Sequence, residues 1–374
     1  YAFGKKSAYY LDRLYLNDGS GNFTYAENSI PNLHVNSTTT VAHDYDKDGD
    51  LDLIVGGGAI PNEYPNCEQS YILENENGIF KKVTDVLPNN GFLGMINDIV
   101  VDSMTNNLIV VGEWMPITVL EKQGDNYTNV TKKVGLNETS GWWNCLKQID
   151  IDNDGDLDLV AGNRGTNSFY QVEPGEPAKI VASDFDHNGS VDALPFYYFN
   201  DKKLHPKHTL DEVFIQYPKI RKKFKNYQSY SSATMTDIFT EDELEGASIK
   251  TVHTFSSAVF INNKGKYSMQ KLPQQAQFSE VHGIAVVDIN NDGLKDLVLT
   301  GNNYSADVEA GQNDASIGSV LMNLGKGKFA SAPTTKSGFS TRADTRGTYK
   351  ILIGEKTYFI TVVNGGKLII HALV

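Results

Sequence analysis

The stretch Asp150-Ile-Asp-Asn-Asp-Gly-Asp-Leu-Asp158 decides how this chain of 374 residues is interpreted. It places five carboxylates within nine residues. Carboxylates so close together repel one another unless a cation lies among them. Hard oxygen ligands select calcium or, less well, magnesium. The stretch therefore predicts a site for a divalent cation.

The same spacing occurs four times, beginning at Asp44, Asp150, Asp184 and Asp288. Each copy has Asp or Asn at loop positions 1, 3 and 5, glycine at position 6 and aspartate at position 9. The glycine permits the positive φ that a tight wrap needs. Four copies with one spacing indicate a repeat and not a single active site.

The EF-hand is the obvious alternative, because it shares positions 1, 3, 5 and 6. It also requires a glutamate at position 12, where these loops have Val55, Ala161, Pro195 and Leu299. Short β-type runs that end in glycine flank the loops, as in Leu51-Asp-Leu-Ile-Val55. We therefore predict strand–loop–strand hairpins with a cation in the turn.

Composition excludes several classes of protein. The formal charge is −13, but four divalent cations would add roughly +8 and leave about −5, which is ordinary for a soluble surface. We therefore expect no nucleic-acid partner. No apolar run approaches the roughly 18 residues of a membrane span, so we expect no transmembrane segment. Cys67 and Cys145 are too few for a disulfide framework, and the sequence leaves their pairing open.

The chain begins at Tyr1 without methionine, so we expect that a leader or a longer segment has been removed and that the chain is a fragment of a longer protein. Calcium loops of this kind are filled best where calcium is millimolar. We therefore expect a secreted, periplasmic or cell-surface location.

Strand patterns recur along the chain as four-stranded meanders. We predict units at 41–88, 95–136, 146–181 and 284–330, with another that begins at 181 and is interrupted after Phe199. The unit at 95–136 has no ligands in its turn and should bind no ion. A helical insertion is expected at about 201–252, where Thr209 with Glu212 and Thr240 with Glu243 form capping boxes and Pro218 kinks or splits the first helix.

Successive four-stranded meanders predict an all-β fold, a β-propeller of six or seven blades. We expect one propeller domain over residues 1–374, closed by pairing of the N-terminal and C-terminal segments in one blade. The hairpin expected at its start has strands near 12–16 and 23–25.

The pattern D-x-[D/N]-x-[D/N]-G-x-x-D, followed by Leu-Val/Ile and Gly, resembles the FG-GAP/VCBS repeats of integrin α-subunit propellers. More narrowly, Gly112-Glu-Trp-Met-Pro116, Gly141-Trp-Trp-Asn144 and the helical interruption resemble secreted or surface bacterial VCBS-repeat proteins related to cartilage acidic protein. The resemblance implies calcium loops between the first and second strands of a blade, on the face opposite the ligand surface.

The resemblance also implies up to four structural Ca²⁺ ions, each bound by side chains at positions 1, 3, 5 and 9 and by the carbonyl at position 7. The implied ligands are Asp44, Asp46, Asp48, Asp50 and Asp52; Asp150, Asp152, Asp154, Asp156 and Asp158; Asp184, Asp186, Asn188, Ser190 and Asp192; and Asp288, Asn290, Asp292, Leu294 and Asp296. Because Asn188 and Asn290 replace carboxylates, we expect weaker binding in the third and fourth loops.

The loops after each second strand should lie on the opposite face, because a strand alternates ends. Their candidate ligand-binding residues are Trp114, Asn163, Arg164, Asn302, Asn303 and Tyr304. The alternative is that the glycines and asparagines only form turns and Trp114 packs between blades. Trp142 and Trp143 likewise either stack on a sugar or pack between blades.

Three functions remain open at this stage. The first is a calcium-stabilised, non-catalytic binding propeller for a protein or glycan, and the second is a glycan hydrolase or lyase with its site on the propeller face. Glu309 and Asp314 are the candidate acid/base pair for the second, although their loop has the composition of an ordinary surface loop. The third is a scaffold whose helical insertion holds a partner.

Overall fold

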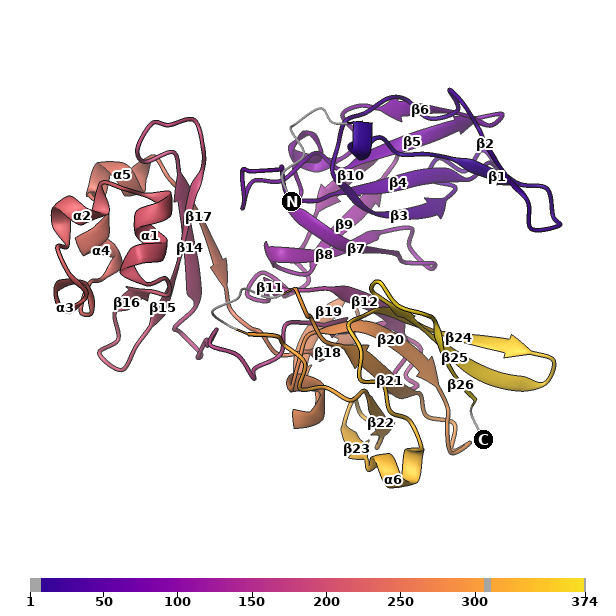
Figure 1. Cartoon of the computed structure of the whole chain (residues 1–374). Helices are drawn as coiled ribbons and strands as arrows, with labels where there is room; N and C mark the ends of the chain where they lie inside the picture. The colour runs from indigo at the N-terminus through magenta and orange to yellow at the C-terminus, as the bar shows by residue number, and fades with distance from the viewer. Residues whose placement is uncertain (1–7, 306–310, 373–374) are drawn as a thin grey trace. The chain divides into compact units, whose positions relative to one another are not determined.

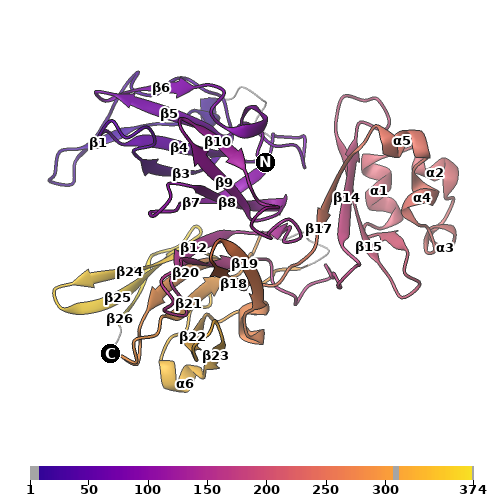
Figure 2. The same cartoon turned by 180° about the vertical axis from the view of Figure 1, so that it is seen from behind.

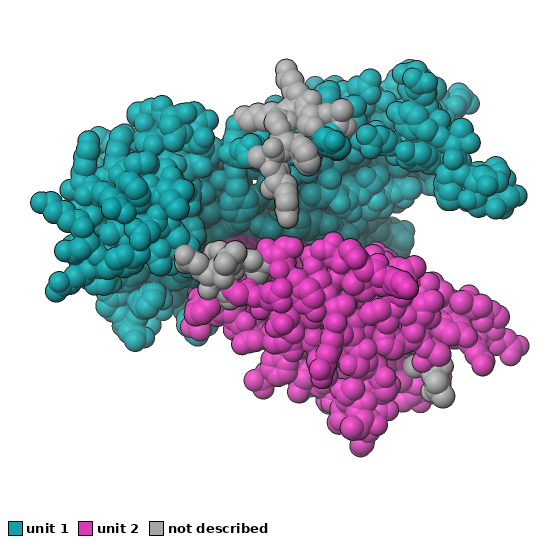
Figure 3. All heavy atoms as spheres, viewed as in Figure 1, with its two compact units in different colours: residues 1–130, 172–252 teal, residues 131–171, 253–374 magenta. Residues whose placement is uncertain are grey.

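The computed structural model describes residues 8–305 and 311–372. The chain divides into two compact units (Figure 3): unit 1 contains Tyr1–Val130 and Val172–Val252, and unit 2 contains Thr131–Gln171 and His253–Val374. Both units consist mainly of antiparallel strands, so the predicted predominance of β-structure is confirmed. In the described part of the chain, no helix is long and apolar enough to cross a membrane.

Unit 1 begins with η1 (Ala8–Tyr10) and the predicted hairpin, β1 (Tyr15–Asn17) with β2 (Phe23–Tyr25). Two antiparallel meanders follow (Figure 1). The first is β3 (Ser37–His43), β4 (Asp52–Gly57), β5 (Tyr71–Glu76) and β6 (Ile79–Val83); after η2 (Pro88–Gly91), the second is β7 (Met95–Val101), β8 (Leu108–Met115), β9 (Thr118–Gln123) and β10 (Asn126–Asn129). Their inner faces share a core that includes Ile54, Ile72, Ile96, Leu108 and Leu120. Both meanders are confirmed.

The rest of unit 1 is a sheet covered by short helices. Its strands, in the order β16-β15-β14-β17, are β14 (Ala178–Ser183), β15 (Asp192–Tyr198), β16 (Leu204–Pro206) and β17 (Ser248–Val252). The helices α1 (Leu210–Gln216), α2 (Ile220–Lys223), α3 (Tyr227–Tyr230), α4 (Met235–Ile238) and α5 (Glu241–Glu245) lie on one face of this sheet (Figures 1 and 2). Aromatic and aliphatic side chains from both layers, including Phe196, Val213, Tyr217 and Phe239, form its core.

The sequence predicts these helices well. Thr209 with Glu212 and Thr240 with Glu243 form the expected capping boxes, and Pro218 separates α1 from α2. Two basic side chains of α2 form specific contacts. Arg221 forms an ion pair with Asp211 at 2.8 Å, and Lys223 Nζ donates to the Ile238 carbonyl at 2.5 Å.

Unit 2 contains β11 (Gly141–Trp142) and three further sheets. These are β12 (Cys145–Ile149), β13 (Asp158–Gly162), β18 (Ala258–Asn263) and β19 (Lys266–Lys271); then, after η3 (Gln274–Gln277), β20 (Val281–Val287), β21 (Asp296–Gly301), β22 (Ser319–Asn323) and β23 (Phe329–Ala332); and, after α6 (Thr334–Ser337), β24 (Thr345–Ile353), β25 (Lys356–Val363) and β26 (Ile369–Ala372). A core that includes Val160, Val259, Leu297 and Leu321 joins the first two sheets.

The predicted four-stranded unit at 146–181 is wrong. β12 and β13 take their third and fourth strands from β18 and β19, because β13 pairs with β18 and β18 with β19. The chain between β13 and β18 therefore carries β14 to β17 as well as the helices. The alternation in Ala178–Ser183 resembles the start of any blade, and only the pairing of distant strands reveals the nesting.

The terminal segments form separate sheets among the described residues, β1 with β2 and β24 with β25 and β26. The number of blades, the closure of a ring and the single propeller domain over 1–374 stay predictions. Cys67 and Cys145 are both free thiols. The Cys145 thiol is buried and donates to the Val281 carbonyl at 3.5 Å.

Candidate metal loops and a buried polar network

The four acidic loops each connect two antiparallel strands. They lie between β3 and β4, β12 and β13, β14 and β15, and β20 and β21, and the aspartate at position 9 is always the first residue of the second strand. The strand–loop–strand arrangement predicted from their flanks is therefore confirmed.

All four loops share one hydrogen-bond pattern. The glycine N–H at position 6 donates to the carboxylate at position 1, as Gly155 does to Asp150 at 3.1 Å. The N–H at position 7 donates to the side chain at position 5, and the N–H at position 2 donates to the carboxylate at position 9. The pattern orients the carboxylates before any cation binds, which lowers the cost of binding.

The wrap needs two left-handed residues in each loop, whereas the sequence pattern pointed to one. Gly155 at position 6 has φ of 95°, and Asn153 at position 4 has φ of 60°. The equivalent residues at position 4 are Lys47, His187 and Asn291, all with positive φ. Asn tolerates this conformation best among non-glycine residues, so the asparagines at position 4 are a signal that sequence reasoning missed.

The first three loops gather carboxylates at the spacing that a cation requires. Ligand oxygens of Asp44, Asp46 and Asp48, of Asp150, Asp152 and Asp158, and of Asp184, Asp186 and Asp192 lie within 4.8 Å of one another in each group. Asp44 Oδ1 and Asp152 Oδ1 are buried and have no hydrogen-bond partner among the described residues. A buried carboxylate oxygen without a partner is costly, and a bound cation would satisfy it. These residues therefore fit a calcium ion.

The raised pKa values of aspartates in the loops also favour a site for a cation. Burial raises the pKa of Asp158 and of Asp192 to about 6. Burial, together with the nearby Asp154 and Asp150 charges, also raises the pKa of Asp152. A divalent cation would favour the ionised forms and reverse these shifts.

The fourth loop differs from the other three because an amide replaces the carboxylate at position 3. Asn290 Nδ2 donates to Asp292 Oδ2 at 2.9 Å, so an N–H dipole partly takes the place that a cation would have. The turn between β7 and β8 has no acidic loop: Asp102 Oδ1 caps it by accepting from Met104 N at 2.8 Å and Thr105 N at 3.1 Å. The predicted weaker binding in the third and fourth loops and its absence at 95–136 stay predictions.

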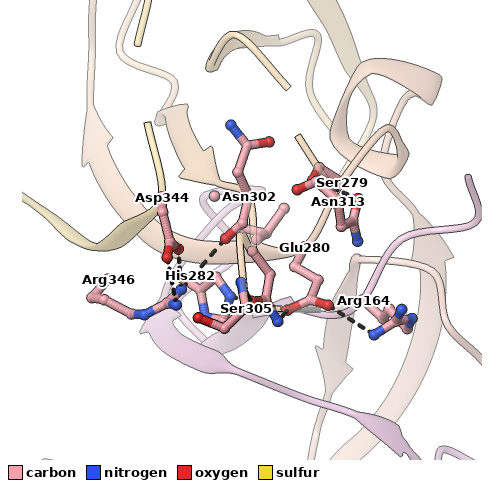
Figure 4. A network of polar contacts seen from close by, with 12 residues as sticks. Arg164, Ser279, Glu280, His282, Asn302, Ser305, Asn313, Asp344 and Arg346 are labelled. Atoms are coloured by element: carbon pink, nitrogen blue, oxygen red, sulfur yellow. Dashed lines mark hydrogen bonds and ion pairs between the residues drawn. The ribbon is translucent and has the colours of Figure 1, made fainter. Parts of the chain in front are cut away.

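A second group of polar residues lies at the opposite ends of the strands of unit 2 (Figure 4). Arg164 follows β13, Glu280 precedes β20, Asn303 follows β21, and Asp344 precedes β24. The metal loops occupy the other ends of β13, β20 and β21. The sequence argument that strands alternate between two faces therefore holds within this unit.

Glu280 is the centre of this network and is 5% exposed. Its Oε1 accepts from Arg164 Nη1 at 2.8 Å, and its Oε2 accepts from Asn303 Nδ2 at 3.1 Å and contacts His282 Nε2 at 3.2 Å. Burial by itself would raise the pKa of Glu280, but the His282 hydrogen bond and the Arg164 charge outweigh it and hold this pKa below its ordinary value. Glu280 is therefore an ionised anchor.

A close backbone approach places Glu280. A Cβ at Gly301 would lie 1.6 Å from the Glu280 carbonyl oxygen, so only glycine fits at the end of β21. The glycine that ends the second strand of the motif thus has a packing role. Gly112 has the same role within β8, where a Cβ would lie 1.8 Å from the Met95 carbonyl oxygen.

Arg164 is held rigidly by aromatic rings. Its guanidinium carbon lies 4.4 Å from the centre of the Tyr170 ring and 4.9 Å from that of Trp142. Both rings also pack against Phe255. A second ion pair, Arg346 with Asp344 at 2.7 Å, lies nearby, and Asn364 also donates to Asp344.

Residues 5–55 match the family model described as an FG-GAP-like repeat. The match includes the loop that starts at Asp44 and confirms the resemblance given by the loop motif.

Among solved structures, the chain is similar to the crystal structure of a GH43_1 enzyme from Xanthomonas citri, with 11% identity, a TM-score of 0.30, and coverage of 91% of this chain and 88% of that chain. It is also similar to the V. cholerae biofilm matrix protein Bap1, with 8% identity, a TM-score of 0.24, and coverage of 87% and 74%. A search of curated proteins finds no match to this sequence.

The predicted ligand-binding residues fall into three groups. Arg164, Asn303 and the 41% exposed Tyr304 lie in or next to the Glu280 network. Asn163 and Asn302 are fully buried, and their amides bond backbone groups within unit 2. Trp114 lies in unit 1, is 5% exposed and donates to Tyr64, which in turn donates to Glu113.

The remaining candidates divide in the same way. Trp143 is fully buried against Phe260 and donates to the Thr139 carbonyl, which is a packing role. Trp142 is half-buried beneath Arg164. Glu309 lies outside the described residues. Glu280, His282, Asp344 and Arg346 were missed by sequence reasoning, because each lies at the start of a strand and carries no motif of its own.

Proposed function

We propose that this chain is a calcium-stabilised binding module that acts outside the cell and is not an enzyme. Structural calcium ions hold the four strand turns, and a protein or glycan ligand binds at the opposite ends of the strands. The observation that carries the calcium part is the pair of buried, unpartnered carboxylate oxygens, Asp44 Oδ1 and Asp152 Oδ1, in loops already oriented for a cation.

The ligand surface in unit 2 is proposed around Arg164, Tyr304 and Trp142. Arg164 is fixed by one ion pair and two aromatic rings, so little side-chain entropy is lost when it binds a ligand. Rigid Arg and aromatic side chains are the groups that most often dominate binding. Their position opposite the metal loops supports this surface.

The charge state of the network favours binding over catalysis. A glycan hydrolase needs one carboxylic acid that stays protonated near neutral pH. Glu280 has a lowered pKa and an arginine partner, and Asp344 also pairs with an arginine. Glu280 is therefore not suited to donate a proton, and it gives the hydrolase hypothesis no support.

Thermal unfolding with and without calcium tests the structural role of the ions. When free calcium is a hundred times the dissociation constant of a loop, binding at that loop adds about 2.7 kcal/mol to the unfolding free energy. The filled loops together should raise the melting temperature by roughly 10 °C or more. EDTA should reverse the increase. An identical melting curve in calcium and in EDTA would contradict the proposal.

The ligand surface is tested with arrays of glycans and of surface proteins probed by the calcium-loaded chain. Any binder should lose affinity in Arg164→Met and Tyr304→Ala, and should keep it in Lys222→Ala, a control on helix α2. Equal binding by all three variants would exclude the surface around Arg164. Released sugar products during the incubation would support the enzyme reading instead.

A further inference from the structure

In four of the sheets, one position on the third strand bonds to the residue that lies at position 9 of the loop or at the equivalent place. In three blades it is an asparagine, Asn75, Asn262 or Asn323, whose backbone N–H donates to the position 9 aspartate of its own blade at 2.7–2.8 Å. In the blade β7–β10 the equivalent pair is Lys122 and Asn107, and the Lys122 N–H donates to Asn107 Oδ1 at 2.9 Å. Strand register makes the four positions equivalent. In each sheet, the residue two places earlier on the third strand pairs with the residue that follows position 9 on the second strand. These earlier residues are Leu73, Leu120, Phe260 and Leu321.

Two of these side chains reach the metal loop of the preceding blade. Asn323 Nδ2 donates at 2.9 Å to the carbonyl of Ile151, which is position 2 of the second loop. Lys122 makes the corresponding contact with the first loop: its Nζ lies 4.5 Å from the centre of the ring of Tyr45, which is position 2 there. The Tyr127 ring, 4.7 Å from Nζ, holds the ammonium from the other side.

The second loop thus has a neutral amide as its neighbour, whereas the first has an ammonium. Burial lowers the pKa of Lys122, while Asp125 and two predicted ligands of the first loop, Asp46 and Asp52, attract its ammonium. Lys122 is half-buried, so its charge is only partly screened by water.

We propose that Lys122 is a built-in cation that weakens calcium binding at the first loop, so that this loop exchanges calcium more readily than the second. This inference rests on the proposed calcium binding and concerns its regulation. The first loop then responds to changes in external calcium while the second stays filled.

Coulomb's law sets the size of the effect. Even with the dielectric constant of water, a unit positive charge at a separation on the order of 10 Å weakens the binding of a divalent ion several-fold. Ligand charge is also the main determinant of affinity in calcium loops. Removal of the ammonium should therefore tighten the first loop about three- to tenfold.

Terbium luminescence can report the first loop separately, since Tyr45 lies within it and can sensitise a bound Tb³⁺ ion. The part of the signal that is lost in Asp44→Asn belongs to this loop. Calcium displaces terbium and gives its affinity. The variant Lys122→Asn carries the residue that the other three blades have, so it should fold, and EDTA melts of each variant verify this.

Lys122→Asn should tighten calcium binding at the first loop by the stated factor, while Lys122→Arg, which keeps the charge, should leave it weak. The reciprocal variant Asn323→Lys should weaken the second loop, measured by calorimetry in the Asp44→Asn background. If calcium binds but Lys122→Asn leaves the first loop unchanged, the inference is overturned and the proposed function stands. If the wild-type chain binds neither ion, the proposed function itself fails.

Discussion

Asp152→Asn should change the stability in opposite directions with and without calcium. Asp152 Oδ1 is buried without a partner, and the Asp150 and Asp154 charges raise the pKa of this carboxyl further. Without calcium, the variant removes a repelling charge from the loop. With calcium, it removes a ligand. A purely structural aspartate would show one sign under both conditions.

The two effects have different sizes. Relief of repulsion in a partly exposed loop should stabilise the calcium-free protein by only about 0.5–1 kcal/mol, because water screens it. When free calcium is a thousand times the dissociation constant of a loop, binding adds about 4.1 kcal/mol to the unfolding free energy. If the variant binds a hundredfold more weakly, the same calcium concentration adds only about 1.4 kcal/mol. After the gain from relieved repulsion is subtracted, the calcium-loaded variant should lose about 2 kcal/mol.

Urea denaturation in EDTA and at saturating calcium measures both numbers. Asp102→Asn is the matched control, since Asp102 caps the equivalent turn of the blade without an acidic loop. Its effect should be the same with and without calcium. If Asp152→Asn destabilises the protein equally under both conditions, a calcium ion in the second loop is refuted.

Three further predictions follow from buried polar groups. Burial raises the pKa of Asp158 and Asp192 to about 6, so the folded protein keeps protons that the unfolded chain loses near pH 4. In EDTA, the contribution of these two carboxyl groups to the unfolding free energy should therefore fall as the pH rises from about 4 to about 6. Calcium should abolish the corresponding fall in melting temperature. Asn163→Ala leaves several buried backbone groups unpaired and should cost about 2–4 kcal/mol in urea denaturation; a loss below about 1 kcal/mol would contradict this role. The lowered pKa of Glu280 stabilises the folded protein at pH values above the ordinary glutamate pKa of about 4.3, and this stability is lost as the pH falls through the pKa of Glu280 in the folded state. Arg164→Met should therefore flatten the acid side of the plot of unfolding free energy against pH. An unchanged slope would show that Arg164 does not contribute to the lowered pKa.

Local features of this chain were predictable because short-range chemistry determines them. The spacing from Asp150 to Asp158 predicted both the turn and its flanking strands, and Thr209 with Glu212 predicted the start of α1. Such features depend on residues a few positions apart. The meanders between Ser37 and Asn129 were also predictable, since each strand pairs with the next in the chain.

Long-range pairing was not predictable in the same way. β13 ends at Gly162 and its partner β18 begins at Ala258, and nothing local distinguishes β14 as part of an insertion. The same limit applies to the candidate site. Arg164 lies next to a motif glycine and was found, but its partner Glu280 lies at the start of a strand far along the chain.

The blade without an acidic loop separates two roles of the aspartate at position 9. In the blades of Asp52, Asp158 and Asp296 this residue both accepts a third-strand N–H and stands among the predicted ligands. Asn107 keeps the first role, because its amide oxygen accepts the Lys122 N–H at the usual distance, and it carries no charge for the second. The hydrogen bond alone is therefore sufficient to hold the strands in register. It follows that calcium in the remaining loops adds stability to turns that are already formed, which is why removal of the ion should lower the melting temperature without abolishing the fold.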